Sequence, residues 1–189
     1  MVIGASNYPD DQHLLLYHQE LGGRFEEWTD KLGFRYVNAG GISFADVFRD
    51  GATGILVGTN NVNFSPDQAA KHDLSIRLYR NITPAKLGNH FLNIRLSGQA
   101  IGARARVWTG EHRQTLEVYG GHGHAGHRDD DDLRFGLGKA RKADKVEIRW
   151  PDAKNTTQVF QNVQADRFYR LSKGAQLEPV VSGTSGPTK

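Results

Sequence analysis

The chain has 189 residues, enough for one mid-sized domain or two small ones. Its hydrophobic fraction of 38% is low, but short bursts of apolar residues recur throughout, which indicates a folded protein and argues against disorder. It contains no cysteine, which excludes disulfides, thiolate zinc sites and thiol catalysis, and its formal charge of +3 is spread without a long basic run, so we infer no nucleic-acid partner.

Residues 1–6 have neither the basic start nor the apolar stretch of a secretion signal. No run of about 18 apolar residues is present that could span a bilayer. We therefore expect no transmembrane segment and no signal peptide in the chain as given, which would be soluble unless it is a trimmed piece of an exported precursor.

Most of the chain is predicted to form short strands joined by tight turns. Apolar runs of about four to six residues are bounded by Gly, Asn and Asp, which is typical of β-structure. Two segments, 25–32 and 66–72, could each form a helical turn or two, the second with Ser65 as N-cap and Pro66 at the first helical position.

An internal repeat is present in the first part of the chain. Residues 2–7 (VIGASN) lead to 15–18 (LLYH), and residues 56–61 (LVGTNN) lead to 77–81 (RLYRN). The spacing is that of one propeller blade plus a loop insertion. Because one and a half blades cannot close a ring, we expect a protein partner to cover the open propeller edge.

Residues 22–34 and 44–58 resemble FG-GAP (VCBS-type) repeats, whose blades carry an Asp-rich loop that binds calcium. Only Asp46, Asp50 and Gly51 match that loop, while Phe48 and Gly54 stand where the family has ligands. The resemblance implies a degenerate calcium site at Asp46 and Asp50. The alternative, which we favour, is that these two side chains shape the turn through hydrogen bonds to its backbone.

A second pattern begins near residue 89 and predicts a compact β-module. Alternation of apolar and polar residues in 91–96 and 145–150 predicts a sheet with one wet face. Seven short strands in under 90 residues predict a small β-sandwich or open barrel. The predicted strands are 91–96, 103–108, 114–119, 133–135, 145–150, 156–160 and 168–171.

Four motifs of this module, in order and spacing, resemble the ASPIC/UnbV domain. They are NHFL (89–92), IGARA (101–105), FGLG (135–138) and VEIRWPD (146–152). That domain normally follows FG-GAP repeats in proteins of the cartilage acidic protein type and in many secreted bacterial relatives, which implies a periplasmic or extracellular location.

The roles expected for these motifs are structural. Gly102 suits a positive φ or a close approach of strands, and Gly136 and Gly138 suit a bulge that turns Phe135 and Leu137 inward. Trp150 is expected to close the core at the end of its strand.

The loop at 120–132 departs from the family pattern because it carries three histidines and four aspartates. His122, His124 and His127 could converge on zinc, nickel or copper, with aspartates orienting them. The alternative is a solvated or partner-contacting loop whose acidic run meets a basic partner or protects a sheet edge.

The prediction is therefore an all-β chain with a partial β-propeller segment at 1–84, an ASPIC/UnbV-like module at 85–173 and a flexible tail at 174–189. Nucleophile-elbow, phosphate-loop and dinucleotide motifs are missing, so we expect no enzyme. We expect a non-catalytic binding or scaffolding protein, an accessory subunit of a larger extracytoplasmic assembly that could reach a membrane complex through a partner. The alternatives are a metal-dependent or carbohydrate-active protein that uses the histidine loop, and a calcium-binding adhesion module.

Overall fold

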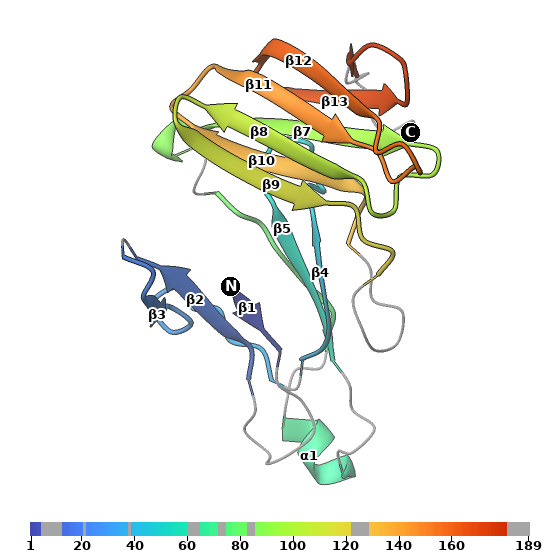
Figure 1. The fold of residues 1–189 in the computed structure, drawn as a ribbon. Coiled ribbons are helices and arrows are strands. Elements are labelled where there is room, and N and C mark those ends of the chain that lie inside the picture. Colours follow the sequence, from blue (N-terminus) through green and yellow to red (C-terminus); the bar gives the residue numbers. More distant parts are fainter. Residues whose placement is uncertain are drawn as a thin grey trace, which may run out of the picture. The chain divides into compact units, whose positions relative to one another are not determined.

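The computed structural model describes residues 1–4, 13–20, 22–37, 39–59, 65–71, 75–82, 86–121 and 129–180. These residues are almost entirely β and form several sheets, which confirms the predicted all-β class; no closed barrel is found among them (Figure 1). In this described part no helix has the length and apolar character needed to cross a membrane.

The chain divides into two compact units, each with its own core. Unit 1 comprises Met1–Ala45 and Gly54–Arg80, and unit 2 comprises Asp46–Thr53 and Asn81–Lys189. The turn Asp46–Thr53 therefore belongs to unit 2, although the strands on either side of it belong to unit 1.

Unit 1 contains two three-stranded antiparallel sheets, each made of strands consecutive in the sequence. The first sheet has the order β1-β2-β3 and the second β4-β5-β6. The bounds are β1 (Val2–Ile3), β2 (Leu15–Gln19), β3 (Phe25–Glu27), β4 (Ala39–Ala45), β5 (Gly54–Thr59) and β6 (Arg77–Tyr79).

The part of the unit 1 core that the structure describes is small. It has five buried apolar residues, with partly buried neighbours from β1, β2, β4, β5 and β6 packed against them. Tyr36 is buried and anchors a distant segment, because its hydroxyl donates a hydrogen bond to the Ser75 carbonyl at 2.8 Å. The five buried residues are Leu14, Phe34, Tyr36, Ala39 and Val57.

The helix predicted at 25–32 is wrong, whereas the one predicted at 66–72 is confirmed as α1 (Pro66–Lys71). Residues 25–27 instead form β3, which pairs with β2. Gly22 and Gly23 have φ values of 90° and 84°, which allow a tight turn back along β2. A ladder of backbone hydrogen bonds is thus available to this segment, and it replaces a helix too short to be stable alone.

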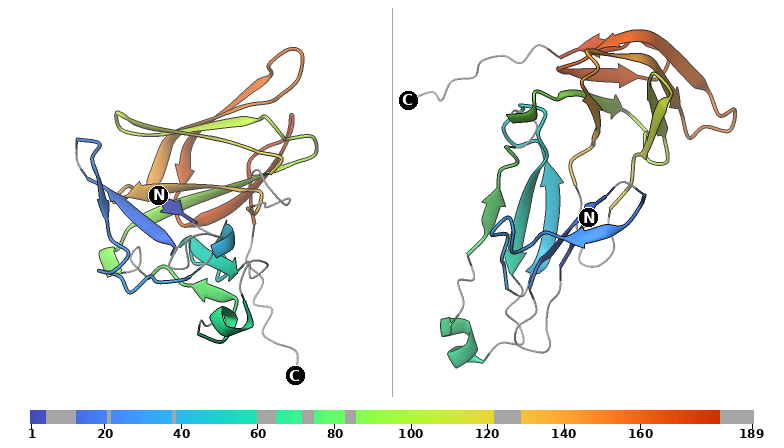
Figure 2. Two further views of the ribbon diagram at one scale, coloured as in Figure 1. Left: turned by 90° about the horizontal axis from the view of Figure 1, so that it is seen from below. Right: turned by 90° about the vertical axis from the view of Figure 1, so that its left-hand side faces the viewer.

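Unit 2 is a two-layered β-sandwich (Figures 1 and 2). One sheet has the order β10-β7-β13-β14 and the other β12-β11-β8-β9; β7 and β13 are parallel and the other pairs antiparallel. The bounds are β7 (His90–Ser97), β8 (Arg104–Thr109), β9 (His112–Glu117), β10 (Asp132–Gly138), β11 (Lys142–Arg149), β12 (Thr157–Gln164), β13 (Arg167–Ser172) and β14 (Glu178–Pro179).

The core of unit 2 lies between these two sheets and contains nineteen buried residues among those described. On β11 and just beyond it, Val146, Ile148 and Trp150 are buried, while the alternating Lys145, Glu147 and Arg149 face outward, as the sequence predicted. Both layers contribute to one continuous cluster, so the two sheets stabilise each other.

The glycines of the module have the predicted structural roles. Gly102 has a φ of 86°. The register between β10 and β7 shifts between Gly136 and Gly138, which is the expected bulge, and Phe135 and Leu137 are buried beside it.

Candidate functional site

The predicted calcium-loop residues Asp46 and Asp50 both bind the backbone of their own turn. The Asp46 carboxylate accepts hydrogen bonds from the Asp50 amide at 3.1 Å and the Gly51 amide at 2.8 Å. The Asp50 carboxylate accepts one from the Ala52 amide at 3.1 Å. Burial raises the pKa of Asp46, and the two backbone hydrogen bonds oppose that rise. These carboxylates therefore shape the turn.

The same turn packs on the outer face of sheet β10-β7-β13. The Arg49 guanidinium lies over the Phe168 ring at 4.4 Å from its centroid, and Phe168 meets Phe91 edge to face at 5.4 Å. Gly51 approaches Phe91 so closely that a Cβ at this position would lie 2.0 Å from the ring. The close contact explains why this turn is part of unit 2.

Neither of the two predicted metal sites is tested by the described residues. His122, His124 and His127 lie outside the described residues, so the transition-metal site stays a prediction. Within the described ranges no group of three or more His, Asp or Glu side chains is placed to hold a metal ion. Calcium binding by Asp46 and Asp50 likewise stays a prediction, with the backbone hydrogen bonds as their described contacts.

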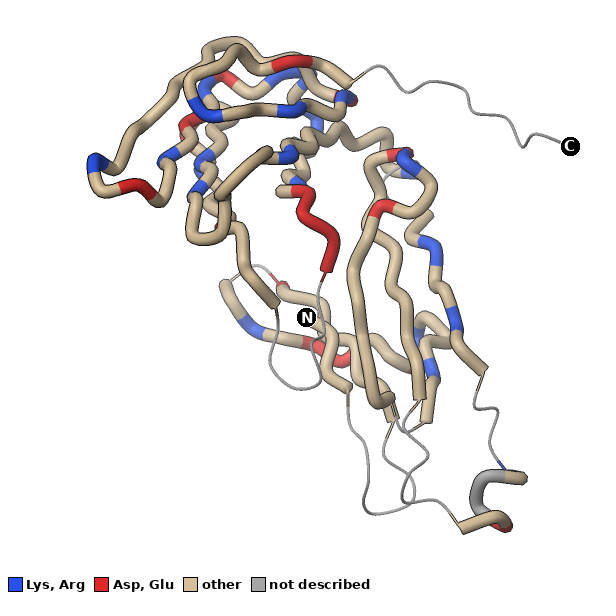
Figure 3. Tube along the Cα trace, turned by 90° about the vertical axis from the view of Figure 1, so that its right-hand side faces the viewer, with Lys and Arg blue, Asp and Glu red and all other residues tan. Residues whose placement is uncertain are grey.

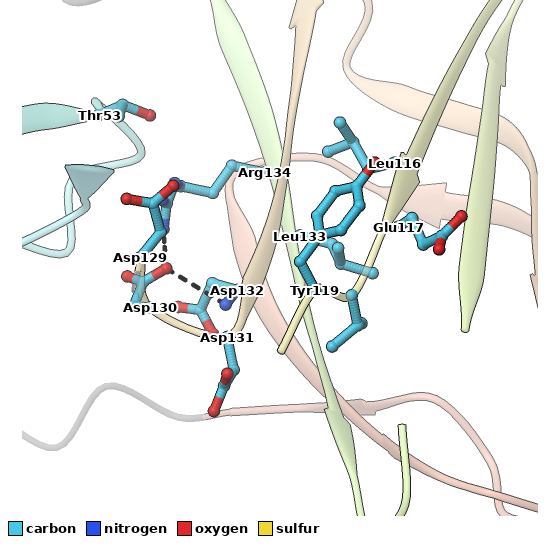
Figure 4. A pocket seen from close by; sticks show the side chains of 11 residues that line it. Thr53, Leu116, Glu117, Tyr119, Asp129, Asp130, Asp131, Asp132, Leu133 and Arg134 are labelled. Atoms are coloured by element: carbon cyan, nitrogen blue, oxygen red, sulfur yellow. Dashed lines mark hydrogen bonds and ion pairs between the residues drawn. The ribbon is translucent and has the colours of Figure 1, made fainter. Parts of the chain in front are cut away.

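A hollow of about 310 Å³ lies beside the aspartate run that follows the histidine loop (Figure 4). Four aspartates, 129–132, line one side of it, and Leu116 and Tyr119 line the other. Asp130 pairs with Arg134 and accepts a hydrogen bond from the Asp132 amide at 3.2 Å. Asp132 in turn pairs with Arg95 at 2.6 Å. At least two of the four carboxylates are thus neutralised by arginines of the sandwich.

A second hollow, of about 740 Å³, lies at one end of the sandwich and is lined by two of the predicted family motifs. Ile101, which is 62% exposed, and the Trp150–Asp152 segment contribute to its wall. Trp150 donates its indole N–H to the Gln158 side chain at 2.7 Å. Asp152 pairs with Lys173 and accepts the Thr156 amide at 2.8 Å, and these contacts hold the pKa of Asp152 well below its ordinary value.

The sequence motifs gave no indication of an exposed apolar surface on one sheet of unit 1. Leu56 on β5 and Leu78 on β6 are direct cross-strand partners, exposed by 44% and 43%. Ile76, two residues before Leu78, is 73% exposed. A Cβ at Gly58, two residues along β5 from Leu56, would meet nothing within 4 Å. We call Leu56, Ile76 and Leu78 the apolar sheet face.

Alternation in β5 and β6 could have revealed this face. Ile55, Val57 and Tyr79 pack in the core of unit 1, so Leu56 and Leu78 must point to the opposite side of the sheet. Both sides of these strands are therefore apolar, which is typical of a sheet covered on two faces.

A family model described as ASPIC and UnbV matches residues 95–178. The matched segment runs from within β7 to β14, so it includes most of the sandwich and confirms the ASPIC/UnbV part of the sequence prediction. Domains of this family are in general non-enzymatic and of an extracellular type. No curated protein matches the chain. The FG-GAP resemblance of residues 1–84 and the relation to the cartilage acidic protein family stay predictions.

Proposed function

We propose that the protein is a non-catalytic binding or scaffolding protein, an accessory subunit of a larger extracytoplasmic assembly, and that a protein partner covers the apolar sheet face of unit 1. The observation that carries this proposal is the exposure of Leu56 and Leu78 together on one side of sheet β4-β5-β6, with the exposed Ile76 immediately before β6.

Burial of this face in a partner would be favourable. Full burial of a Leu or Ile side chain is worth about 1.5–3 kcal/mol, so covering the exposed fraction of each residue contributes on the order of 1 kcal/mol. Exposed apolar clusters on a sheet typically mark interaction surfaces. Three such residues would provide the centre of a contact, with the polar strand ends around them as its rim.

The size of the unit 1 core points in the same direction. Among the described residues, the core cluster of unit 1 has five buried apolar residues and that of unit 2 has nineteen. A unit with so small a core is marginal alone, because apolar burial must offset the entropy of ordering its chain. Contact with a partner would supply the missing burial.

The arrangement of the repeat supports a propeller-like partner surface. The strands of the two repeat units form equivalent antiparallel pairs, β1 with β2 and β5 with β6. Each pair belongs to a meander of consecutive strands, as in a propeller blade. Blades pack face to face, so an exposed blade face is a natural contact for a further blade-like sheet.

Light scattering and a fluorescent dye for apolar surfaces test this proposal on the full chain. We expect Leu56→Ser with Leu78→Ser to reduce dye binding and any self-association, with little change in melting temperature. Leu32→Ser is the matched control, because Leu32 is 58% exposed elsewhere in unit 1. A stable monomer with one sharp melting transition, whose dye binding responds equally to both variants, would contradict an obligate partner at this face.

A photoreactive residue at position 56 tests for the partner directly. In its native cells the chain should cross-link from position 56 to a defined protein, whereas the same residue at position 32 should not.

A further inference from the structure

The outer face of sheet β12-β11-β8-β9 carries a concentration of positive charge. Alternation places five cations on it, from three neighbouring strands: Arg104 and Arg106 on β8, Arg113 on β9, and Lys145 and Arg149 on β11. The residues between them, such as Ala105, Val107, Val146 and Ile148, face the core. We call these five cations the basic sheet face; Figure 3 marks Lys and Arg positions along the chain.

The face is positive even after its own acids are counted. Two carboxylates lie on the same face: Glu117 is paired across the strands with Arg104, and Glu147 with Arg106. The face therefore carries five cations and two carboxylates. This excess equals the formal net charge of +3 of the whole chain. On the other side of β11, β12 adds no charge to the face. Its residues paired with the outward side chains of β11 are the uncharged Thr157, Val159 and Gln161.

Two of the five cations have no acidic partner among the described residues. Arg104 pairs with Glu117 at 2.6 Å, and Glu147 holds both Arg106 at 3.1 Å and Lys145 at 3.0 Å. Arg113 and Arg149 form no ion pair within the described ranges, and the buried Nε of Arg149 has no hydrogen-bond partner there.

The arrangement is unfavourable for the isolated sheet. Arg149 lies directly opposite Arg104 in the register of β11 and β8. Like charges at directly opposed positions destabilise a sheet, and neither side chain contributes to the core between the layers. A partner that brings negative charge would turn this cost into a gain.

The chemistry of the cations selects the kind of negative charge. Four of the five are arginines, whose planar forks bind carboxylates through two parallel hydrogen bonds. Trp108 lies on the same face, registered with Arg113 on one side and on the other with Lys145, whose ammonium is 4.5 Å from its ring centroid. Arginine and tryptophan are the residues enriched at the energetic centres of protein interfaces.

The shape of the face favours a large partner over a small ligand. None of the three hollows described in unit 2 is lined by any of the five cations. The side chains stand on a regular pleated sheet, which offers an open surface and no pocket. We infer that the basic sheet face of unit 2 binds an Asp- and Glu-rich surface of a partner protein.

This inference goes beyond the proposed function, because it concerns a different unit and gives the chemistry of the partner. The apolar sheet face could fail its test while the basic sheet face passes, since the variants and readouts differ.

Binding of the full chain to poly-L-glutamate tests the inference. We expect measurable binding that weakens as salt rises, because exposed charges are screened. Arg104→Gln, Arg113→Gln and Arg149→Gln combined should weaken it by about tenfold or more. The control combines Lys154→Gln, Arg167→Gln and Arg170→Gln, which removes the same charge from exposed positions elsewhere in unit 2. The affinity of this control for poly-L-glutamate should stay within about threefold of the affinity of the parent chain, because only the net charge has changed.

Other polyanions serve as competing probes in the same titration: duplex DNA, heparin and vesicles rich in phosphatidylglycerol. The inference is overturned if poly-L-glutamate does not bind at low salt, if both triple variants lose affinity equally, or if any of the other probes binds about tenfold more tightly than poly-L-glutamate. Neither variant should melt at a lower temperature than the parent chain, which separates loss of binding from loss of fold.

Discussion

Asp152 shows how one half-buried carboxylate fixes a chain reversal at the end of the sandwich. It accepts the Thr156 amide at 2.8 Å and pairs with Lys173, and these contacts lower its pKa. An acid with a lowered folded pKa stabilises the fold once it is ionised. Its contribution is complete above the ordinary carboxyl pKa of about 4 and is lost as the pH falls below that value.

We therefore expect Asp152→Asn to lower the melting temperature at pH 7 and to differ less from the parent chain at pH 3. Lys173→Gln should reproduce the part of the loss that comes from the ion pair. Melting followed by circular dichroism at both pH values measures this. A difference between parent and variant that is the same at pH 7 and pH 3 would show that ionisation of Asp152 contributes nothing.

Gly51 provides a second test at the scale of one residue. Its φ is 83°, and a Cβ would lie 2.0 Å from the Phe91 ring. Gly110 has a φ of 58°, but a Cβ there would meet nothing within 4 Å. A side chain in this backbone region costs about 1–2 kcal/mol, and overpacking against a ring adds about 1–3 kcal/mol.

Gly51→Ala should thus lower the free energy of unfolding by about 3 kcal/mol, and Gly110→Ala by about 1 kcal/mol. Urea denaturation of both variants measures the difference. Equal losses would mean that the turn does not press on Phe91.

At the scale of elements, local patterns predicted the strands of unit 2 well. All seven strands expected between residues 91 and 171 are present, because alternation and β-branched runs reflect the burial that forms each strand. The bounds differ by a few residues, as at β9 and β10, because backbone pairing extends beyond the apolar run. The two-residue β14 carried no apolar signal at all.

Long-range pairing explains what the sequence did not reveal. Residues 25–27 became a strand because β2 was available as a partner. The hydrogen bonds of Asp46 and Asp50 are local, and their residue types suggested them. The packing of the same turn against Phe91 and Phe168 joins segments more than 35 residues apart, and no local pattern encodes such a contact.

The histidine loop is an element whose prediction remains open. If His122, His124 and His127 form a solvated or partner-contacting loop, chain purified without a His tag should contain transition metal well below one atom per molecule. Replacing all three by Ala should then leave the melting temperature unchanged, as should His112→Ala, an exposed control on β9. Stoichiometric zinc, nickel or copper that disappears only in the triple variant would support the metal site instead.

At the scale of the whole molecule, each unit presents a different surface chemistry. The apolar sheet face of unit 1 would gain from burial, and the basic sheet face of unit 2 would gain from neutralisation. A partner that engages both needs an apolar region and an acidic region. Candidate partners are therefore proteins that have both an apolar and an acidic contact surface. Such a pair of surfaces is characteristic of a protein assembly, and a small ligand is too small to provide it.

The division into units itself predicts how a fragment behaves. A chain that starts at Asn81 keeps the nineteen-residue core and should fold, but it lacks the turn Asp46–Thr53. Phe91 and Phe168 should then be more exposed, so we expect a lower melting temperature and increased binding of a dye for apolar surfaces.

Phe168→Ser distinguishes loss of this turn from general weakening. In the full chain it removes the contact with Arg49 and the edge-to-face pair with Phe91, so it should destabilise the fold by about 2–3 kcal/mol. In the fragment it should cost less and reduce dye binding, because there the ring has lost its Arg49 partner. Val159→Ser, at an exposed position on β12, should act alike in both chains. Equal effects of Phe168→Ser in the two chains would show that the turn contributes nothing to unit 2.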